Sequence, residues 1–106
     1  MSPTQRSLAH ARKEGFICAV VEKWNPHSKT RSDLFGLFDI LMICEGSIIG
    51  VQACAGASHA ARRVKMLAEP RLETWKEAGG EAWIYSWAKQ GARGKRKVWT
   101  LRRESL

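Results

Sequence analysis

Asp39 and Gln52 are the side chains whose types and spacing suggest chemistry, because a short β-hairpin would place them opposite each other. Residues 35–44 form an apolar run that predicts a buried strand, and residues 47–54 predict the returning strand. The turn between them is Glu45-Gly46. If the residues that flank this turn pair with each other, Asp39 pairs with Gln52, with Cβ atoms about 5 Å apart on one face.

An acidic side chain that faces a second oxygen-bearing side chain on an apolar strand suggests a small metal site. Asp39 would supply a charge and Gln52 a carbonyl oxygen. The alternative is that Asp39 only ends a buried stretch, with its carboxylate satisfied by backbone groups or a nearby arginine. A register slip of one residue would turn Gln52 to the opposite face and remove the site.

The composition indicates one basic domain. A chain of 106 residues can bury a core but is too short for two domains, so we expect residues 1–106 to form a single domain. It carries 18 Lys and Arg against 10 Asp and Glu, a net charge of +8. Such an excess attracts polyanions, of which DNA is a common one. A basic surface can also serve solubility alone. A protein-interaction module whose basic charge is incidental is therefore a weaker hypothesis beside nucleic-acid binding.

The cysteines and the amino-terminal residues indicate the compartment. Cys18, Cys44 and Cys54 are odd in number and far apart, and no Cys-x-x-Cys pair exists. This pattern argues against a zinc site and favours reduced, buried thiols. The first residues contain no apolar signal core, and no segment is long enough to span a membrane. We therefore expect a soluble, cytoplasmic protein with no membrane partner.

The remaining pattern predicts an α/β fold. Ser2 and Pro3 are good residues to begin a helix and Gly15 to end it, while Pro70 interrupts a later helical segment. A meander of three strands between helices needs cover on more than one face, which favours a mixed sheet flanked by helices over a barrel. The predicted elements are a helix over 3–14, strands over 16–24, 35–44 and 47–54, helices over 58–68 and 71–78, and strands over 82–89 and 98–103. Residues 25–32 are expected to form a polar loop.

The helix predicted over 58–68 has two stripes. The apolar stripe, expected to pack, comprises Ala60, Ala61, Val64, Leu67 and Ala68. The polar stripe comprises Ser58, Arg62, Lys65 and Glu69, at spacings that align them on one side. Arg62 and Lys65 therefore either reach the site on the preceding strand or form a solvated face.

This element order, with Asp39 on the second strand and Gln52 and Cys54 on the third, resembles the PD-(D/E)XK nuclease superfamily. Within it, the chain looks most like small Holliday-junction-resolvase and VRR-NUC type nucleases. The likeness spans roughly residues 3–89. It implies an αβββαβ restriction-endonuclease-like core, here with an extra C-terminal strand. It also implies a Mg²⁺- or Mn²⁺-dependent endonuclease that acts on branched or structured DNA as a homodimer.

The resemblance also assigns roles to single positions. In that superfamily an aspartate binds the metal, and the next strand carries Glu-x-Lys, whose lysine activates or orients the attacking water. Asp39 matches the aspartate, while Gln52 and Cys54 stand where the glutamate and the lysine would be. The motif is therefore degenerate: it lacks one charge at the metal and the ammonium group at the water. Thr4 and Gln5 stand where resolvase-type members carry a further glutamate.

Two residues are candidates to compensate for these departures. Lys65 lies one helix later, and relocation of the catalytic lysine to this helix is known in the superfamily. Asp33, just before the second strand, is a candidate second carboxylate. It is at least as well placed to cap or brace the loop beside Arg31.

Phosphate binding has its own candidates. The second predicted helix follows directly from the third strand, and free N–H groups at a helix start favour a phosphate there. Basic loops before the second strand and near the end of the chain would flank the nucleic acid, although a charge run is often only a solvated face. The candidate residues are Lys29, Arg31, Ser58, Arg62, Lys89, Arg93, Lys95 and Arg96.

The aromatic and histidine residues allow several interpretations. Trp83, Tyr85 and Trp87 alternate along one strand, which indicates core packing against a helix. A base-stacking platform and a dimer interface are the alternatives. His27 and His59 are interpreted as surface or capping residues and His10 as structural.

Two hypotheses for function follow. The first is a Mg²⁺-dependent endonuclease in which Asp39, Gln52 and Lys65 carry the chemistry. The second is a nuclease fold that has lost its chemistry and kept nucleic-acid binding, because a fold does not determine an activity.

Overall fold

The computed structural model describes all 106 residues and is built on one mixed five-stranded β-sheet. Its strands lie in the order β1 (Ile17–Val20), β4 (Ile40–Cys44), β5 (Ser47–Ala55), β6 (Glu81–Gln90) and β7 (Val98–Ser105). β5 and β6 are parallel, and all other neighbours are antiparallel. The predicted α/β class, with a mixed sheet and a C-terminal strand, is confirmed.

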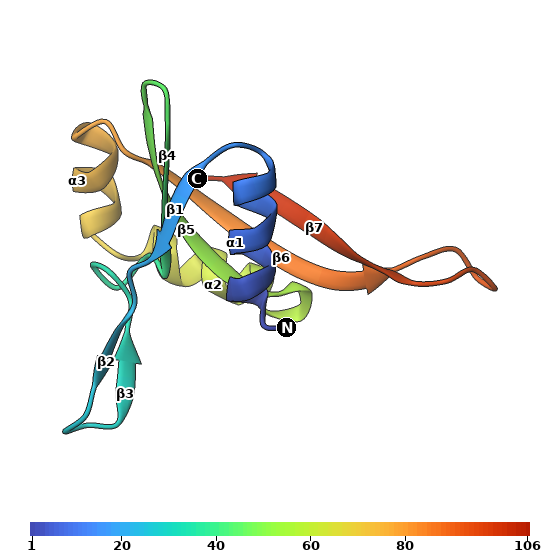
Figure 1. Cartoon of the computed structure of the whole chain (residues 1–106). Coiled ribbons are helices and arrows are strands. Elements are labelled where there is room, and N and C mark those ends of the chain that lie inside the picture. Colours follow the sequence, from blue (N-terminus) through green and yellow to red (C-terminus); the bar gives the residue numbers. More distant parts are fainter.

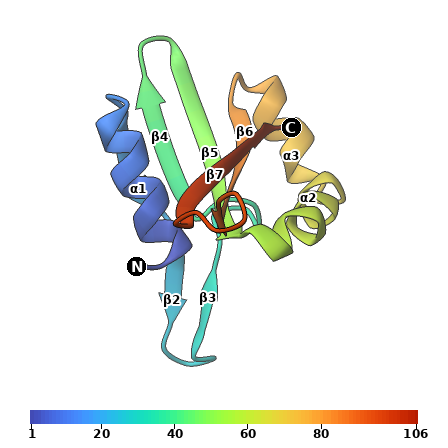
Figure 2. The same cartoon turned by 90° about the vertical axis from the view of Figure 1, so that its right-hand side faces the viewer.

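Helices cover both faces of this sheet (Figures 1 and 2). α1 (Pro3–Lys13) packs on one face, and α2 (His59–Leu67) and α3 (Arg71–Glu77) lie on the other. Ser2 begins α1 as predicted, since its Oγ accepts a hydrogen bond from the Gln5 N–H at 3.2 Å. The largest buried side chains on the α1 side are Ile40, Met42, Ile49 and Tyr85, and those on the other side are Leu37, Phe38, Met66 and Ile84.

The β4–β5 hairpin has the predicted register from the turn as far as Ile40, but the ladder ends there and does not include the predicted pair of Asp39 and Gln52. Cys44 pairs with Ser47 across a two-residue turn, and Ile40 pairs with Val51. Gly46 allows this turn because its φ is +73°, a value that glycine adopts without a steric cost. Because side chains alternate between the faces of a strand, Gln52 lies on the face opposite to Val51, on the side of α2 and α3.

The second predicted strand begins later than the sequence indicated. Residues 35–39 are not part of the strand, which starts at Ile40. They belong to a tight turn in which Leu34 forms an isolated bridge with Phe38, and both Phe35 and Gly36 have positive φ. This turn brings Asp33 back towards the start of β4, next to the residues of the candidate site.

Residues 21–32 also differ from the prediction. Instead of one strand over 16–24 followed by a loop, β1 ends at Val20, and β2 (Lys23–Asn25) pairs with β3 (Thr30–Ser32) in a separate hairpin. Asn25 closes the turn, because its Oδ1 accepts the His27 N–H at 2.9 Å. This hairpin, here called the first arm, projects away from the sheet (Figure 1).

β6 and β7 form a second projection. They pair from Trp83 opposite Ser105 as far as Gln90 opposite Val98, and their ends leave the body of the molecule. The ends of the two strands and the turn between Gln90 and Val98 are here called the second arm. The arms extend in different directions (Figure 1).

The alternation on β6 confirms core packing of its aromatic residues. Tyr85 is fully buried on the α1 side, and Trp83 packs against the same core. Trp87 is held there too, since its Nε1 donates to Ser7 Oγ at 2.9 Å. His10 contacts the edges of Tyr85 and Trp87, which agrees with its structural role. These side chains are therefore not an exposed stacking platform.

The prediction that the apolar stripe of α2 packs against the sheet was wrong. Val64 and Leu67 are 67% and 50% exposed, whereas His59 and Met66 are buried. Most of the stripe is alanine, which costs little to expose, so its periodicity carried a weak signal. The polar face of α2 is consequently turned towards the sheet and the candidate site. None of the helices has the length and apolar character that a membrane-spanning segment needs.

Candidate functional site

Asp39 lies directly before β4, and both its backbone and its side chain form hydrogen bonds with β5. Its N–H donates to the Val51 carbonyl at 3.0 Å. The Ala53 N–H donates to the carboxylate, with distances of 3.1 and 3.3 Å to its two oxygens. The side chain is only 5% exposed. The carboxylate thus has the backbone partner that one interpretation of the sequence expected, and it remains the one buried acid at this end of the sheet.

The environment of Asp39 favours the protonated carboxyl. Burial raises its pKa from 3.8 to about 7, although the hydrogen bond from Ala53 partly opposes this rise. The nearby charges of Asp33 and Glu22 raise the pKa further. A carboxyl with this pKa changes its protonation state near neutral pH, so a bound cation would compete with a proton for it.

Gln52 is held by its amide nitrogen. Its Nε2 donates to the Leu37 carbonyl at 2.7 Å and to Asp33 Oδ2 at 3.0 Å. Two acceptors fix the nitrogen, and this leaves Oε1 without a hydrogen bond to the protein. The structure therefore joins Gln52 to Asp33, the residue that the sequence offered as a second carboxylate.

A hollow of about 510 Å³ opens beside these residues, between the base of the first arm and α2. We call it the basic hollow; it is lined by Arg31, Ser32, Asp33, Gly36, Arg62, Lys65 and Arg71. Four of its side chains are cationic and one is acidic, and none of its residues is apolar. Such a lining attracts anions and suits a phosphate group.

The hollow brings together only some of the predicted nucleic-acid contacts. Arg31, Arg62 and Lys65 line it, whereas Ser58 ends the 3₁₀ turn Gly56–Ser58 and is not among its lining residues. Lys29 lies at the tip of the first arm, where its φ is +54°. The predicted contacts Lys89, Arg93, Lys95 and Arg96 lie on the second arm, which also carries Lys97. Their contacts with nucleic acid stay predictions.

Cys54 occupies the position at which the superfamily carries lysine. Its thiol is buried in the core beneath α2 and α3. Burial raises the pKa of this thiol above 9.0, while the charge of Arg62 opposes the rise and that of Asp39 adds to it. The thiol is consequently neutral at physiological pH and supplies no charge to the site. These electrostatic effects also indicate that Arg62 and Asp39 both lie near Cys54.

The interpretation of His59 as a surface or capping residue was wrong. It is 1% exposed, with Nδ1 at 2.6 Å from Ser86 Oγ and Nε2 at 2.8 Å from Glu104 Oε1. Arg63 Nε donates to the other oxygen of Glu104 at 3.0 Å. Because Ser86 is buried, we interpret this chain of contacts as a fastening of α2 to β6 and β7 rather than as a nucleophile. It helps to direct the polar face of α2 towards the basic hollow.

Two residues of this region were not found from the sequence. Arg71 lines the hollow from the start of α3 and bonds Glu69 Oε1 at 2.6 Å, which holds the pKa of Glu69 at about 2. Glu22 acts on Asp39 through its charge and is paired with Arg31 at 3.1 Å. No spacing in the sequence links either residue to Asp39, because each arrives through tertiary structure.

The chemical type of the donor atoms near Asp39 suits a hard cation. Asp39, Asp33 and Gln52 Oε1 offer oxygen atoms, which Mg²⁺ and Mn²⁺ prefer. No group of three or more His, Cys, Asp and Glu side chains is close enough to hold a metal ion by itself. Mg²⁺ commonly binds through one or two carboxylates together with waters and substrate phosphates, so the two carboxylates remain a suitable set.

Comparison with known proteins adds no family: no family model, no curated protein and no solved structure matches this chain. The function must therefore be inferred from the geometry of its own residues.

Proposed function

We propose that this protein binds DNA and hydrolyses its phosphodiester bonds with a bound Mg²⁺ or Mn²⁺ ion, acting on branched or otherwise structured DNA. The observation that carries the proposal is the buried Asp39, whose pKa is raised in part by the charge of Asp33, a residue that itself lines the basic hollow. A carboxyl that is costly to ionise is the kind of perturbed group that clusters at functional sites, and Asp33 lies between it and the cations of the basic hollow, which suit a phosphate. The order of strands and helices around it supports the same proposal.

Each residue has a role in this proposal. Asp39 and Gln52, with Asp33, would hold the ion, which when bound supplies an acidified water and neutralises phosphate charge. Arg31, Arg62 and Arg71 would bind the phosphate, where planar guanidinium groups can donate two parallel hydrogen bonds. Lys65 lines the same hollow and would orient the attacking water in place of the lysine that is absent at Cys54.

A second candidate function is binding of nucleic acid without cleavage. It is favoured by the Ala53 hydrogen bond to Asp39 and by the shortage of acidic ligands for a metal. The two candidates share the basic hollow and differ only in whether hydrolysis follows binding.

The activity test uses labelled single-stranded, duplex and four-way-junction DNA, each with Mg²⁺, Mn²⁺ or EDTA. We expect the protein to cut at least one of the three substrates in the presence of either metal and none in EDTA. Binding in every condition with no cutting in either metal would reject hydrolysis and leave the second candidate.

Phosphate binding has a separate test in an Arg62→Gln/Lys65→Gln double variant. If each cation neutralises one phosphate, the log–log salt slope of duplex binding should become shallower by about 2. We expect the affinity at low salt to fall roughly 10- to 100-fold. The matched control is Arg12→Gln/Lys13→Gln, which removes two exposed charges from α1. Equal losses in the two double variants would show that only net charge matters.

We further propose that two copies pair through the β1 edge of the sheet. β1 has a neighbour on one side only. Ile17, Ile43 and Ile48 are successive register partners across β1, β4 and β5, and all three are exposed. Such a row next to an unpaired edge suits an interface between copies. Sedimentation equilibrium measures the mass of the protein in solution, and we expect the mass of a dimer. A mass equal to that of the monomer at all concentrations would reject this pairing.

A further inference from the structure

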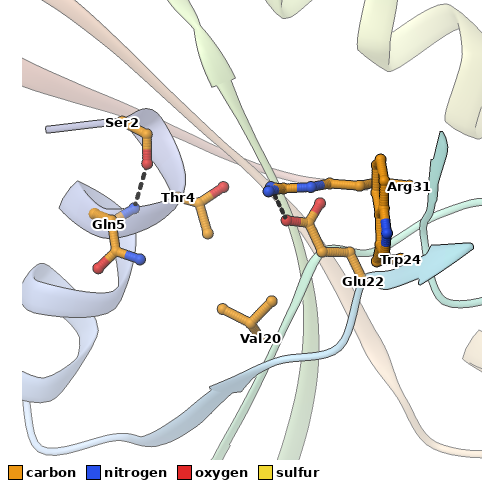
Figure 3. Close-up of a pocket in the computed structure, with 7 residues that line it drawn as sticks. All are labelled: Ser2, Thr4, Gln5, Val20, Glu22, Trp24 and Arg31. Atoms are coloured by element: carbon orange, nitrogen blue, oxygen red, sulfur yellow. Dashed lines mark hydrogen bonds and ion pairs between the residues drawn. The ribbon is translucent and has the colours of Figure 1, made fainter. Parts of the chain in front are cut away.

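A second hollow, of about 460 Å³, lies on the other side of the base of the first arm. The start of α1 contributes Ser2, Thr4 and Gln5, and the arm and the segment leading to it contribute Glu22, Trp24 and Arg31 (Figure 3). Its volume falls within the range of roughly 300–1,000 Å³ that small-molecule sites have. We call it the Trp24 hollow. It is separate from the basic hollow but shares Arg31 with it.

Trp24 differs from the other four tryptophans. Trp75, Trp83 and Trp87 pack against other rings, and Trp99 has the Arg6 guanidinium over its ring at 3.8 Å. Trp24 has neither an aromatic nor a cationic partner, and it is 54% exposed on an arm without a core. An indole that forms one wall of a hollow and has no partner of its own is suited to stack on a flat ligand ring.

The other side chains of the hollow can recognise the edge of such a ring. Glu22 Oε1 forms an ion pair with Arg31 Nη1 at 3.1 Å, which leaves the second carboxylate oxygen of Glu22 as a hydrogen-bond acceptor. Thr4 and Gln5 present hydroxyl and amide groups from the opposite wall (Figure 3). An aromatic face with donors and acceptors at its border matches the way proteins bind unpaired nucleobases.

Arg31 connects this hollow to the phosphate site. It lies opposite Trp24 in the β2–β3 register and also lines the basic hollow with Arg62 and Lys65. Both hollows therefore lie at the root of the first arm. A nucleotide whose phosphate binds in the basic hollow can place its nucleobase in the Trp24 hollow. A base inside a duplex is stacked on both faces and cannot enter.

We infer that the Trp24 hollow is a binding site for an unpaired nucleobase next to the phosphate that the basic hollow holds. The substrate class is thus DNA with an unpaired nucleotide at the bound position, as in a single strand, a bulge or an open branch. This inference rests on the proposed DNA binding but needs no cleavage.

The test measures binding in EDTA, so that no hydrolysis occurs. The probes are a duplex with one unpaired 2-aminopurine and the same duplex fully paired. The variants are Trp24→Ala, Trp24→Phe and, as a control of equal size, Trp99→Ala, which removes an exposed tryptophan outside the hollow. Trp24 makes no packing contact with another ring, so its replacement should leave the fold intact.

We expect the wild type to prefer the unpaired probe by about tenfold or more, with 2-aminopurine fluorescence quenched on binding. Trp24→Ala should lose both the preference and the quenching while its affinity for the paired duplex is unchanged. Trp24→Phe and Trp99→Ala should keep most of the preference. Equal affinity of the wild type for both probes, or a preference that survives Trp24→Ala, would overturn the inference. Neither result depends on whether the protein cuts DNA, so a failure of the base site and a failure of catalysis are distinguishable.

Discussion

An Asp39→Asn variant is expected to be more stable than the wild type at pH 8, by about 2–4 kcal/mol, because ionisation of the buried carboxyl opposes folding. Asparagine keeps an oxygen that can accept the Ala53 N–H and removes the charge. A substitution that stabilises the fold at a buried polar position is unusual, and it is expected where a residue is kept for function at a cost in stability.

The pH dependence of this difference has a definite sign. Below about pH 4 the carboxyl is protonated in both the folded and the unfolded chain, so ionisation costs nothing. Between about pH 4 and pH 7 the unfolded chain releases this proton and the folded one retains it, so wild-type stability falls as the pH rises. Above about pH 7 the penalty is complete and constant.

Urea denaturation of both proteins from pH 4 to pH 8 measures this difference. The gap should be small at pH 4 and widen up to about pH 7. An exposed carboxylate on α3 provides the control, since Glu73→Gln should follow the pH dependence of the wild type. A gap that is the same at every pH would show that ionisation of Asp39 is not its cause.

The hairpin that carries the site could be predicted because its signals are local. A two-residue turn ending in Gly46 fixes the register, and the register decides which face Gln52 occupies. The cap at Ser2 and the alternation on β6 are local signals of the same kind. Each was therefore visible in the spacing of residues.

The rest of the site depends on contacts that no spacing reveals. The first arm has no buried residue, so its two short strands produced no apolar period, and residues 25–32 were predicted as a loop. Asp33 reaches Gln52 only because of the turn at Phe35 and Gly36, where φ is positive at both residues.

The orientation of α2 is a second case. Its apolar period predicted that Val64 and Leu67 would pack, yet the buried contacts of His59 with Ser86 and Glu104 turn the opposite side inwards. Those partners lie 27 and 45 residues away along the chain. Helical periodicity therefore gave the two faces of α2 but not which one is buried.

The most direct test of the account compares the rates of metal-dependent DNA cleavage by the wild type and by Asp39→Asn. The fold of the variant is expected to be at least as stable, so a loss of activity cannot be attributed to unfolding. If Asp39 holds the metal ion, its replacement should slow cleavage at least about 100-fold, a loss of roughly 2.7 kcal/mol of transition-state stabilisation.

The wild-type rate should also rise with pH up to about 7, as Asp39 loses its proton and becomes able to bind the ion. Cleavage that requires Mg²⁺ or Mn²⁺, follows this pH dependence and disappears in Asp39→Asn is the predicted result. Equal rates for the wild type and the variant would contradict the account, because the buried carboxyl would then have no part in the chemistry.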